Sequence, residues 1–119
     1  MKKLTLICIS LLSFSAFSSP DKIASHEAYN HLNSLVTVCG QLSDVRKLRE
    51  NIKLDVDGKY PNSNISFSFN SHIAKKLQKK WGGFNNTEGQ TICASGVVEE
   101  VRGKLQITLH HQRDIEIIK

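Results

Sequence analysis

An alternation of apolar and polar residues dominates the chain from residue 35 onward, and this period of two predicts β-strands. In residues 35–43, Val36, Val38 and Leu42 share one face with Gly40. The same period recurs in four later segments. Their predicted inward positions are Ile52, Leu54 and Val56; Ile65, Phe67 and Phe69; Ile92, Ala94, Gly96 and Val98; and Leu105, Ile107 and Leu109. We therefore expect five strands, each with one face in the core.

Other segments follow a helical or an irregular pattern. Residues 21–32 are predicted to form a short helix that Ser25 can cap. A second helix is expected to begin with Ser71 as its cap and to end at the glycine pair 82–83, with apolar residues at helical spacing between them. Residues 114–118 form a last extended piece.

The predicted elements follow one another as three strands, a helix and two strands. That order is typical of an OB-fold, a five-stranded Greek-key β-barrel with a helix between strands 3 and 4. We therefore predict an all-β OB-fold barrel preceded by a short N-terminal helix. The length supports one hydrophobic core, so residues 19–119 are expected to form a single domain.

Four segments also resemble a family, the small exported bacterial OB-fold nucleic-acid-binding-like domains. The segments are VTVCGQL at 36–42, DGKYP at 57–61, GQTICASGVV at 89–98 and VRGKLQI at 101–107. The resemblance extends over about residues 24–118, and the Tyr-Pro loop and the last hairpin are its most specific parts. It implies the OB-fold more strongly than it implies a function, because one fold serves many functions.

Residues 1–18 have the features of a secretory signal peptide. Lys2 and Lys3 precede an apolar segment, and residues 16–18 (Ala-Phe-Ser) suit cleavage before Ser19. The alternative is an N-terminal membrane anchor, but the apolar run of about 14 residues is shorter than the roughly 20 that span a bilayer. We expect a cleaved signal peptide, a periplasmic or secreted domain, and no transmembrane segment in the mature chain.

Composition adds little to this picture. The 119 residues include 16 Lys+Arg and 11 Asp+Glu, and 39% are hydrophobic, which excludes a disordered or collagen-like chain. Loss of Lys2 and Lys3 on cleavage lowers the net charge from +5 to +3. A charge this small does not by itself indicate a nucleic-acid partner.

Two cysteines, Cys39 and Cys93, remain in the predicted mature chain. Disulfides persist in exported proteins, so an even pair indicates one bridge. In an OB barrel the first strand pairs antiparallel with the fourth, and both cysteines lie on the faces opposite the core, where they can be neighbours across the ladder. Two free buried thiols are the alternative. A redox-active pair would need C-x-x-C spacing, which is absent.

The two loops that flank the binding face of an OB barrel carry cations in this chain. We therefore expect a basic rim that binds single-stranded nucleic acid or another polyanion. Its candidate residues are Arg46, Lys47, Arg49, Lys53, Tyr60, Arg102 and Lys104. Alternatively, the cations belong to solvated turns and Tyr60 pins its loop beside Pro61.

The predicted outward face of the second and third strands weighs against strong nucleic-acid binding. It carries Asp55 and Asp57 and no aromatic residue on which a base could stack. An envelope module that binds a small ligand, a glycan or a protein is therefore the alternative function. A second basic patch on the second helix is expected to be a solvated face or a contact for an anionic membrane or polymer. It comprises Lys75, Lys76, Lys79 and Lys80.

No motif indicates catalysis, a cofactor or a metal. His26 and His31 are five residues apart, and the adjacent His110 and His111 point to opposite sides of a strand, so neither pair suits a metal site. We expect a non-enzymatic binding module without a cofactor.

Overall fold

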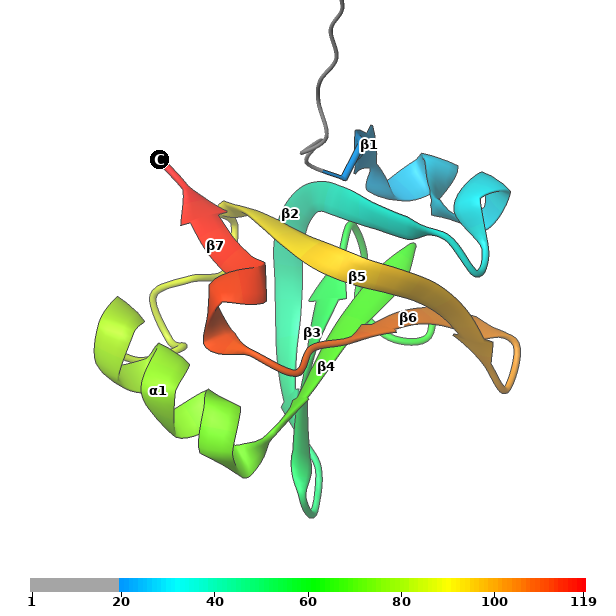
Figure 1. Cartoon of the computed structure of the whole chain (residues 1–119). Helices are drawn as coiled ribbons and strands as arrows, with labels where there is room; N and C mark the ends of the chain where they lie inside the picture. The colour runs from blue at the N-terminus through cyan, green and yellow to red at the C-terminus, as the bar shows by residue number, and fades with distance from the viewer. Residues whose placement is uncertain (1–19) are drawn as a thin grey trace, which may run out of the picture.

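The computed structural model describes residues 20–119; the predicted signal peptide lies outside the described residues. Seven strands occur in this part of the chain (Figure 1), two more than the alternation predicted. The elements are β1 (Lys22–Ala24), the 3₁₀ helix η1 (Ser25–His31), β2 (Leu35–Lys47), β3 (Asn51–Val56), β4 (Ile65–Asn70), α1 (Ser71–Trp81), β5 (Thr91–Val101), β6 (Lys104–Thr108), the 3₁₀ helix η2 (Gln112–Asp114) and β7 (Ile115–Ile118).

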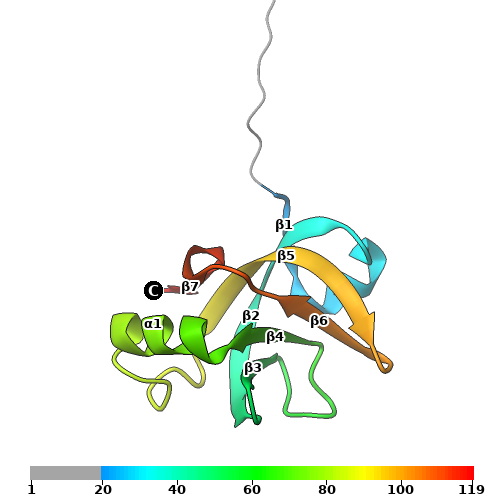
Figure 2. The same cartoon turned by 60° about the horizontal axis from the view of Figure 1, so that its bottom comes forward.

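The predicted order of three strands, a helix and two strands is present as β2, β3, β4, α1, β5 and β6. These five strands pair in a cycle: β2 with β3, β3 with β4, β4 with β6, β6 with β5, and β5 back with β2. The short strands β1 and β7 are the two additions, and they extend the β2–β5 sheet on either side. Figure 2 shows the sheet curving around the interior, with α1 beside β4.

The core lies inside this cycle of strands. Most of the predicted inward residues are buried there, among them Val38, Leu54, Phe67, Ile92 and Ile107, which have no exposed surface, whereas Ile52 and Leu105 are only partly buried. Leu77 of α1 is equally buried and packs into the same cluster. The alternation therefore identified the core faces correctly.

Two helix starts differ from the prediction. The residues just before η1 form β1, and Ser25 does not cap the helix, because its hydroxyl donates to the Asp57 carboxylate instead. At α1 the N-cap is Asn70 rather than Ser71, since the Asn70 side chain accepts the Ile73 N–H at 2.9 Å. The predicted end is confirmed, with Gly82 in the left-handed conformation.

A β-bulge in β2 decides which way its second half faces. The register against β3 shifts between Leu42 and Asp44, so Leu42 is opposite Val56 and Val45 is opposite Leu54. Even-numbered residues face the core before the bulge and odd-numbered residues face it afterwards. The strand also continues to Lys47, past the segment 35–43 in which the alternation was recognised.

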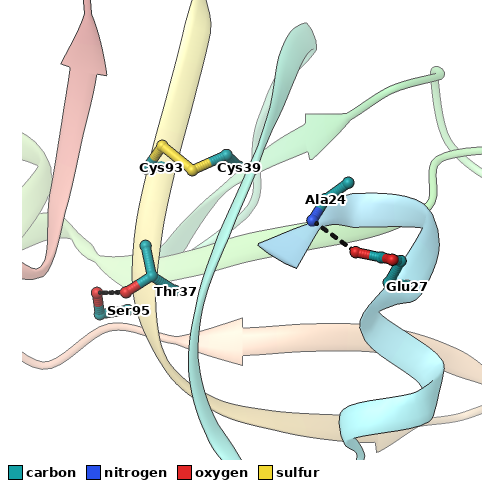
Figure 3. The surroundings of a disulfide bond; sticks show 6 residues. All are labelled: Ala24, Glu27, Thr37, Cys39, Cys93 and Ser95. Carbon is teal, nitrogen blue, oxygen red and sulfur yellow. Dashed lines mark hydrogen bonds between the residues drawn. A yellow bond between two sulfur atoms is a disulfide. The ribbon is translucent and has the colours of Figure 1, made fainter. Parts of the chain in front are cut away.

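The predicted disulfide is confirmed. Cys39 of β2 is directly opposite Cys93 of β5, and their sulfur atoms are bonded at 2.04 Å (Figure 3). Two residues along the same ladder, the hydroxyls of Thr37 and Ser95 lie 2.6 Å apart. The bridge therefore joins the two strands that close the cycle of pairings. None of the helices described within residues 20–119 is long and apolar enough to cross a membrane.

Candidate functional site

Five of the seven predicted site residues surround one pocket of about 200 Å³ over the outer face of β3, β4 and β6. We call it the Arg46–Tyr60 pocket. The five are Arg46, Lys53, Tyr60, Arg102 and Lys104. They come from β2, β3, the β3–β4 loop and the β5–β6 hairpin, so the sheet brings together residues that lie far apart in the sequence.

At the base of the pocket, Arg46 and Asp55 form a two-pronged ion pair. Arg46 Nε donates to Asp55 Oδ2 at 2.6 Å and Nη2 donates to Oδ1 at 2.9 Å. The Ser66 hydroxyl also donates to Asp55 Oδ1, at 2.6 Å. Asp55 has no exposed surface, and its hydrogen bonds raise the pKa of Arg46. The guanidinium is therefore a charged and fixed group.

The Tyr60 ring covers this guanidinium. Arg46 Cζ lies 4.1 Å from the ring centroid, a cation–π contact, while 53% of the Tyr60 residue is exposed. Its loop is anchored to β6, because Lys104 Nζ donates to the Pro61 carbonyl at 2.9 Å. The Gly58 N–H donates to the hydroxyl of Ser43, the residue at the bulge, at 2.8 Å. One face of the Tyr60 ring thus lies on Arg46, and the loop that carries the ring is held by hydrogen bonds on both sides of Tyr60.

The remaining cations of the pocket keep donors for a ligand. Lys53 Nζ donates one hydrogen bond to Gln106 Oε1 at 2.9 Å, and Lys104 donates the one to Pro61, whereas an ammonium group carries three donors. Arg102 is exposed in the β5–β6 turn with a φ of 53°. Because Asp55 neutralises only Arg46, these three cations give the pocket a positive charge.

The structure does not bring every predicted residue to this pocket. Lys47 faces a separate pocket near Phe84 and Glu88, and Arg49 lies in the β2–β3 turn, outside the lining of the Arg46–Tyr60 pocket. None of the four exposed α1 lysines lines the Arg46–Tyr60 pocket either.

The prediction of an exposed acidic strand face is wrong for Asp55, which is buried under Arg46 and bonded to the likewise buried Ser66. Asp57 is exposed, as expected. Asp57 is engaged elsewhere, by the Ser25 hydroxyl and the Gln41 N–H. Neither carboxylate therefore opposes an anion in this pocket.

Sequence reasoning missed the apolar part of the lining. Leu48 and Val101 are 46% and 39% exposed and flank the predicted cations, together with the partly buried Leu105. Their signal was their position in or beside the two turns, where an apolar residue has no core face to occupy. These side chains give the pocket an apolar margin that suits the planar part of a ligand.

Within residues 20–119, no three His, Cys, Asp or Glu side chains converge as metal ligands do.

No family model matches the chain, and no curated protein matches its sequence. Solved structures do resemble it. OBody AM3L09, solved bound to hen egg-white lysozyme, has a TM-score of 0.59 and 15% identity over 85% of this chain and 97% of its own. A chain of the yeast Stn1 and Ten1 structure matches with a TM-score of 0.56 and 15% identity, over 87% of this chain and 65% of that chain. The chain has an OB-fold.

A third similar structure is the asparaginyl-tRNA synthetase from Pyrococcus horikoshii, with a TM-score of 0.58 and 13% identity. The match covers 85% of this chain and 24% of the synthetase. For the S. pombe Stn1–Ten1 complex the match covers 58% of that chain. The OB-fold domain thus corresponds to only part of several of these proteins, and at such identities the likeness establishes the fold alone.

Proposed function

We propose that this OB-fold domain is an exported, non-enzymatic five-stranded barrel that binds single-stranded nucleic acid in the Arg46–Tyr60 pocket, weakly and with little sequence preference. The observation that carries the proposal is the exposed Tyr60 ring held on the fixed Arg46 guanidinium among three cations. Export is supported by the signal-like residues 1–18 and by the Cys39–Cys93 bridge, which suits an oxidising compartment.

A single strand needs two things from such a surface, an aromatic face for a base and cations for the phosphates. The outer face of Tyr60 supplies the first, and the cation–π contact with Arg46 beneath it favours this orientation of the ring. Lys53, Arg102 and Lys104 supply the second. Stacking accepts any base, so sequence preference is small. The names of two neighbours, an aspartyl- and an asparaginyl-tRNA synthetase, agree with a nucleic-acid ligand.

The test is fluorescence anisotropy with a labelled single-stranded DNA of mixed sequence. Three phosphate contacts predict a slope of about −2 in the logarithm of affinity against the logarithm of salt, or about 20-fold weaker binding from roughly 50 to 200 mM salt. Tyr60→Ala should weaken binding by about 1–3 kcal/mol, the contribution of one stacked base. Arg102→Ala should lower the magnitude of the salt slope by about 0.7.

Lys75→Ala is the matched control, because it removes one exposed positive charge from α1, outside the Arg46–Tyr60 pocket. It should leave both affinity and slope close to those of the unaltered domain. If binding is absent at low salt, or if Lys75→Ala weakens it as much as Arg102→Ala does, the pocket is not the nucleic-acid site.

A further inference from the structure

A larger pocket, of about 530 Å³, lies between the C-terminal end of α1, the α1–β5 loop and β7. Figures 1 and 2 both place β7 beside that end of α1, away from the β5–β6 turn. Its volume is within the range of small-molecule sites. Six side chains give it its chemistry: Trp81, Asn86, Gln90, Glu116, Lys80 and Lys119. We call it the Trp81 pocket.

Trp81 offers a braced aromatic surface to this pocket. It is the last residue of α1, which stops there because Gly82 adopts a left-handed conformation with a φ of 78°. The Phe84 ring meets the indole edge-on, with centroids 5.8 Å apart, and Phe84 itself stacks on Phe69 of the core at 6.2 Å. Trp81 is only partly buried, so part of a fixed indole remains accessible.

The loop opposite the indole presents amide groups in a fixed arrangement. The Thr87 hydroxyl and N–H both donate to the Phe84 carbonyl, at 2.6 and 3.2 Å, which closes a turn inside residues 84–90. Gln90 Nε2 donates to the Asn86 carbonyl at 2.8 Å, so its Oε1 is left to accept from a ligand. The pocket wall therefore has both donors and acceptors in place.

Three charged side chains border the pocket without pairing with one another. Lys80, Lys119 and Glu116 all line it, yet the one ion pair among residues 20–119 is that of Arg46 with Asp55. Neither ammonium group is paired with a carboxylate within residues 20–119. A carboxylate on the ligand can therefore pair with them.

We propose that the Trp81 pocket binds an acidic sugar, a pyranose that carries a carboxylate. The C–H groups on one face of the ring lie on the negative face of the indole. The hydroxyls, which both donate and accept, bind Asn86, Gln90 and Glu116, and the carboxylate of the sugar binds Lys80 and Lys119. This site shares no lining residue with the Arg46–Tyr60 pocket and does not depend on it.

Trp81 is the only tryptophan of the chain, so its fluorescence reports directly on this pocket. The domain is titrated over a millimolar range with three sugars that differ in charge. Glucuronic acid carries the required negative charge, glucose carries none, and glucosamine carries a positive charge. We expect a saturable change of emission with glucuronic acid, about fivefold weaker affinity for glucose, and the weakest for glucosamine.

Variants that retain the fluorophore locate the contacts. Lys80→Ala should weaken glucuronic acid about fivefold while leaving the affinity for glucose unchanged. Glu116→Gln should weaken glucose, because it removes an acceptor for hydroxyl groups. Lys75→Ala, on the same helix but outside the lining, should change neither affinity, and Tyr60→Ala should leave both intact.

Three results would overturn the proposal. The first is an emission spectrum that glucuronic acid does not change. The second is equal affinity for the three sugars, since the charges would then play no part. The third is tighter binding of uridine monophosphate than of glucuronic acid, which would assign the pocket to a nucleotide.

Discussion

The buried pair of Arg46 and Asp55 makes an asymmetric prediction about stability. In Arg46→Met, Asp55 keeps only the Ser66 hydroxyl as a partner in a site with no exposed surface. Loss of one partner of a buried ion pair lowers the free energy of unfolding by about 3–5 kcal/mol. Because the Ser66 hydrogen bond remains, we expect a loss of about 3–4 kcal/mol for this variant. In a domain of this length that lowers the melting temperature by about 15–20 °C.

Asp55→Asn is expected to cost less, about 1–2 kcal/mol. The side chain keeps its shape and can still bond Ser66, and the Arg46 side chain, which is 23% exposed, can turn its charge toward water. The double variant Arg46→Met/Asp55→Asn should be more stable than Arg46→Met alone, because no charge is then left buried without its partner. The coupling between the two substitutions should be about 2 kcal/mol.

Urea unfolding followed by Trp81 fluorescence and far-ultraviolet circular dichroism measures all four members of this cycle, with the disulfide kept oxidised. The cycle refutes the reasoning if the two single variants cost the same, or if their costs simply add in the double variant. Either result would mean that solvent reaches Asp55 in the folded state. The Arg46→Met domain should also lose affinity for single-stranded DNA, since Tyr60 then lies on no cation.

Two further predictions concern the stability of the β-sheet. Replacing Cys39 and Cys93 together by Ala should lower the free energy of unfolding by about 4 kcal/mol in the chain-entropy model, because the bridge closes a loop with a separation of 54 residues. A urea midpoint equal to that of the oxidised domain would contradict this. Gly40→Ala should lower the free energy of unfolding by about 1–3 kcal/mol, because its new methyl group would overlap the Asp57 carboxylate and Val56 Cγ1. Thermal unfolding measures this loss, and an unchanged melting temperature would mean that the Asp57 loop moves aside freely.

The sequence predicted those features that depend on local periodicity and on the order of elements. Alternation found the inward faces of the strands, and the helix between strands 3 and 4 suggested the OB order that placed Cys39 beside Cys93. The short strand β1 was missed, and β7 was expected only as an extended piece over residues 114–118, because three or four residues carry too little periodicity to distinguish a strand from a loop.

The sites were harder to predict because they depend on contacts between distant segments. The cations of the two turns were visible, but the burial of Asp55 depends on Arg46 from the next strand and Ser66 from another. The Trp81 pocket had no signal at all, since Glu116 and Lys119 reach it only through β7, which pairs with β5. Sequence alternation gave Asp55 an outward direction, but it could not say what lies over it.

The bulge in β2 explains how a cation came to lie over Asp55. With an unbroken alternation from Val36 and Val38, the even-numbered Arg46 would point into the core, where a guanidinium without a partner is costly. The shift between Leu42 and Asp44 reverses the alternation, so Val45 fills the core opposite Leu54 and Arg46 turns outward, diagonal to Asp55.

Ser43 at the bulge also holds Gly58 at the start of the Tyr60 loop. The one inserted residue thus determines the positions of both Arg46 and the loop that carries the Tyr60 ring. A deletion of Ser43 should therefore remove binding to single-stranded DNA even where the remaining strands still pair.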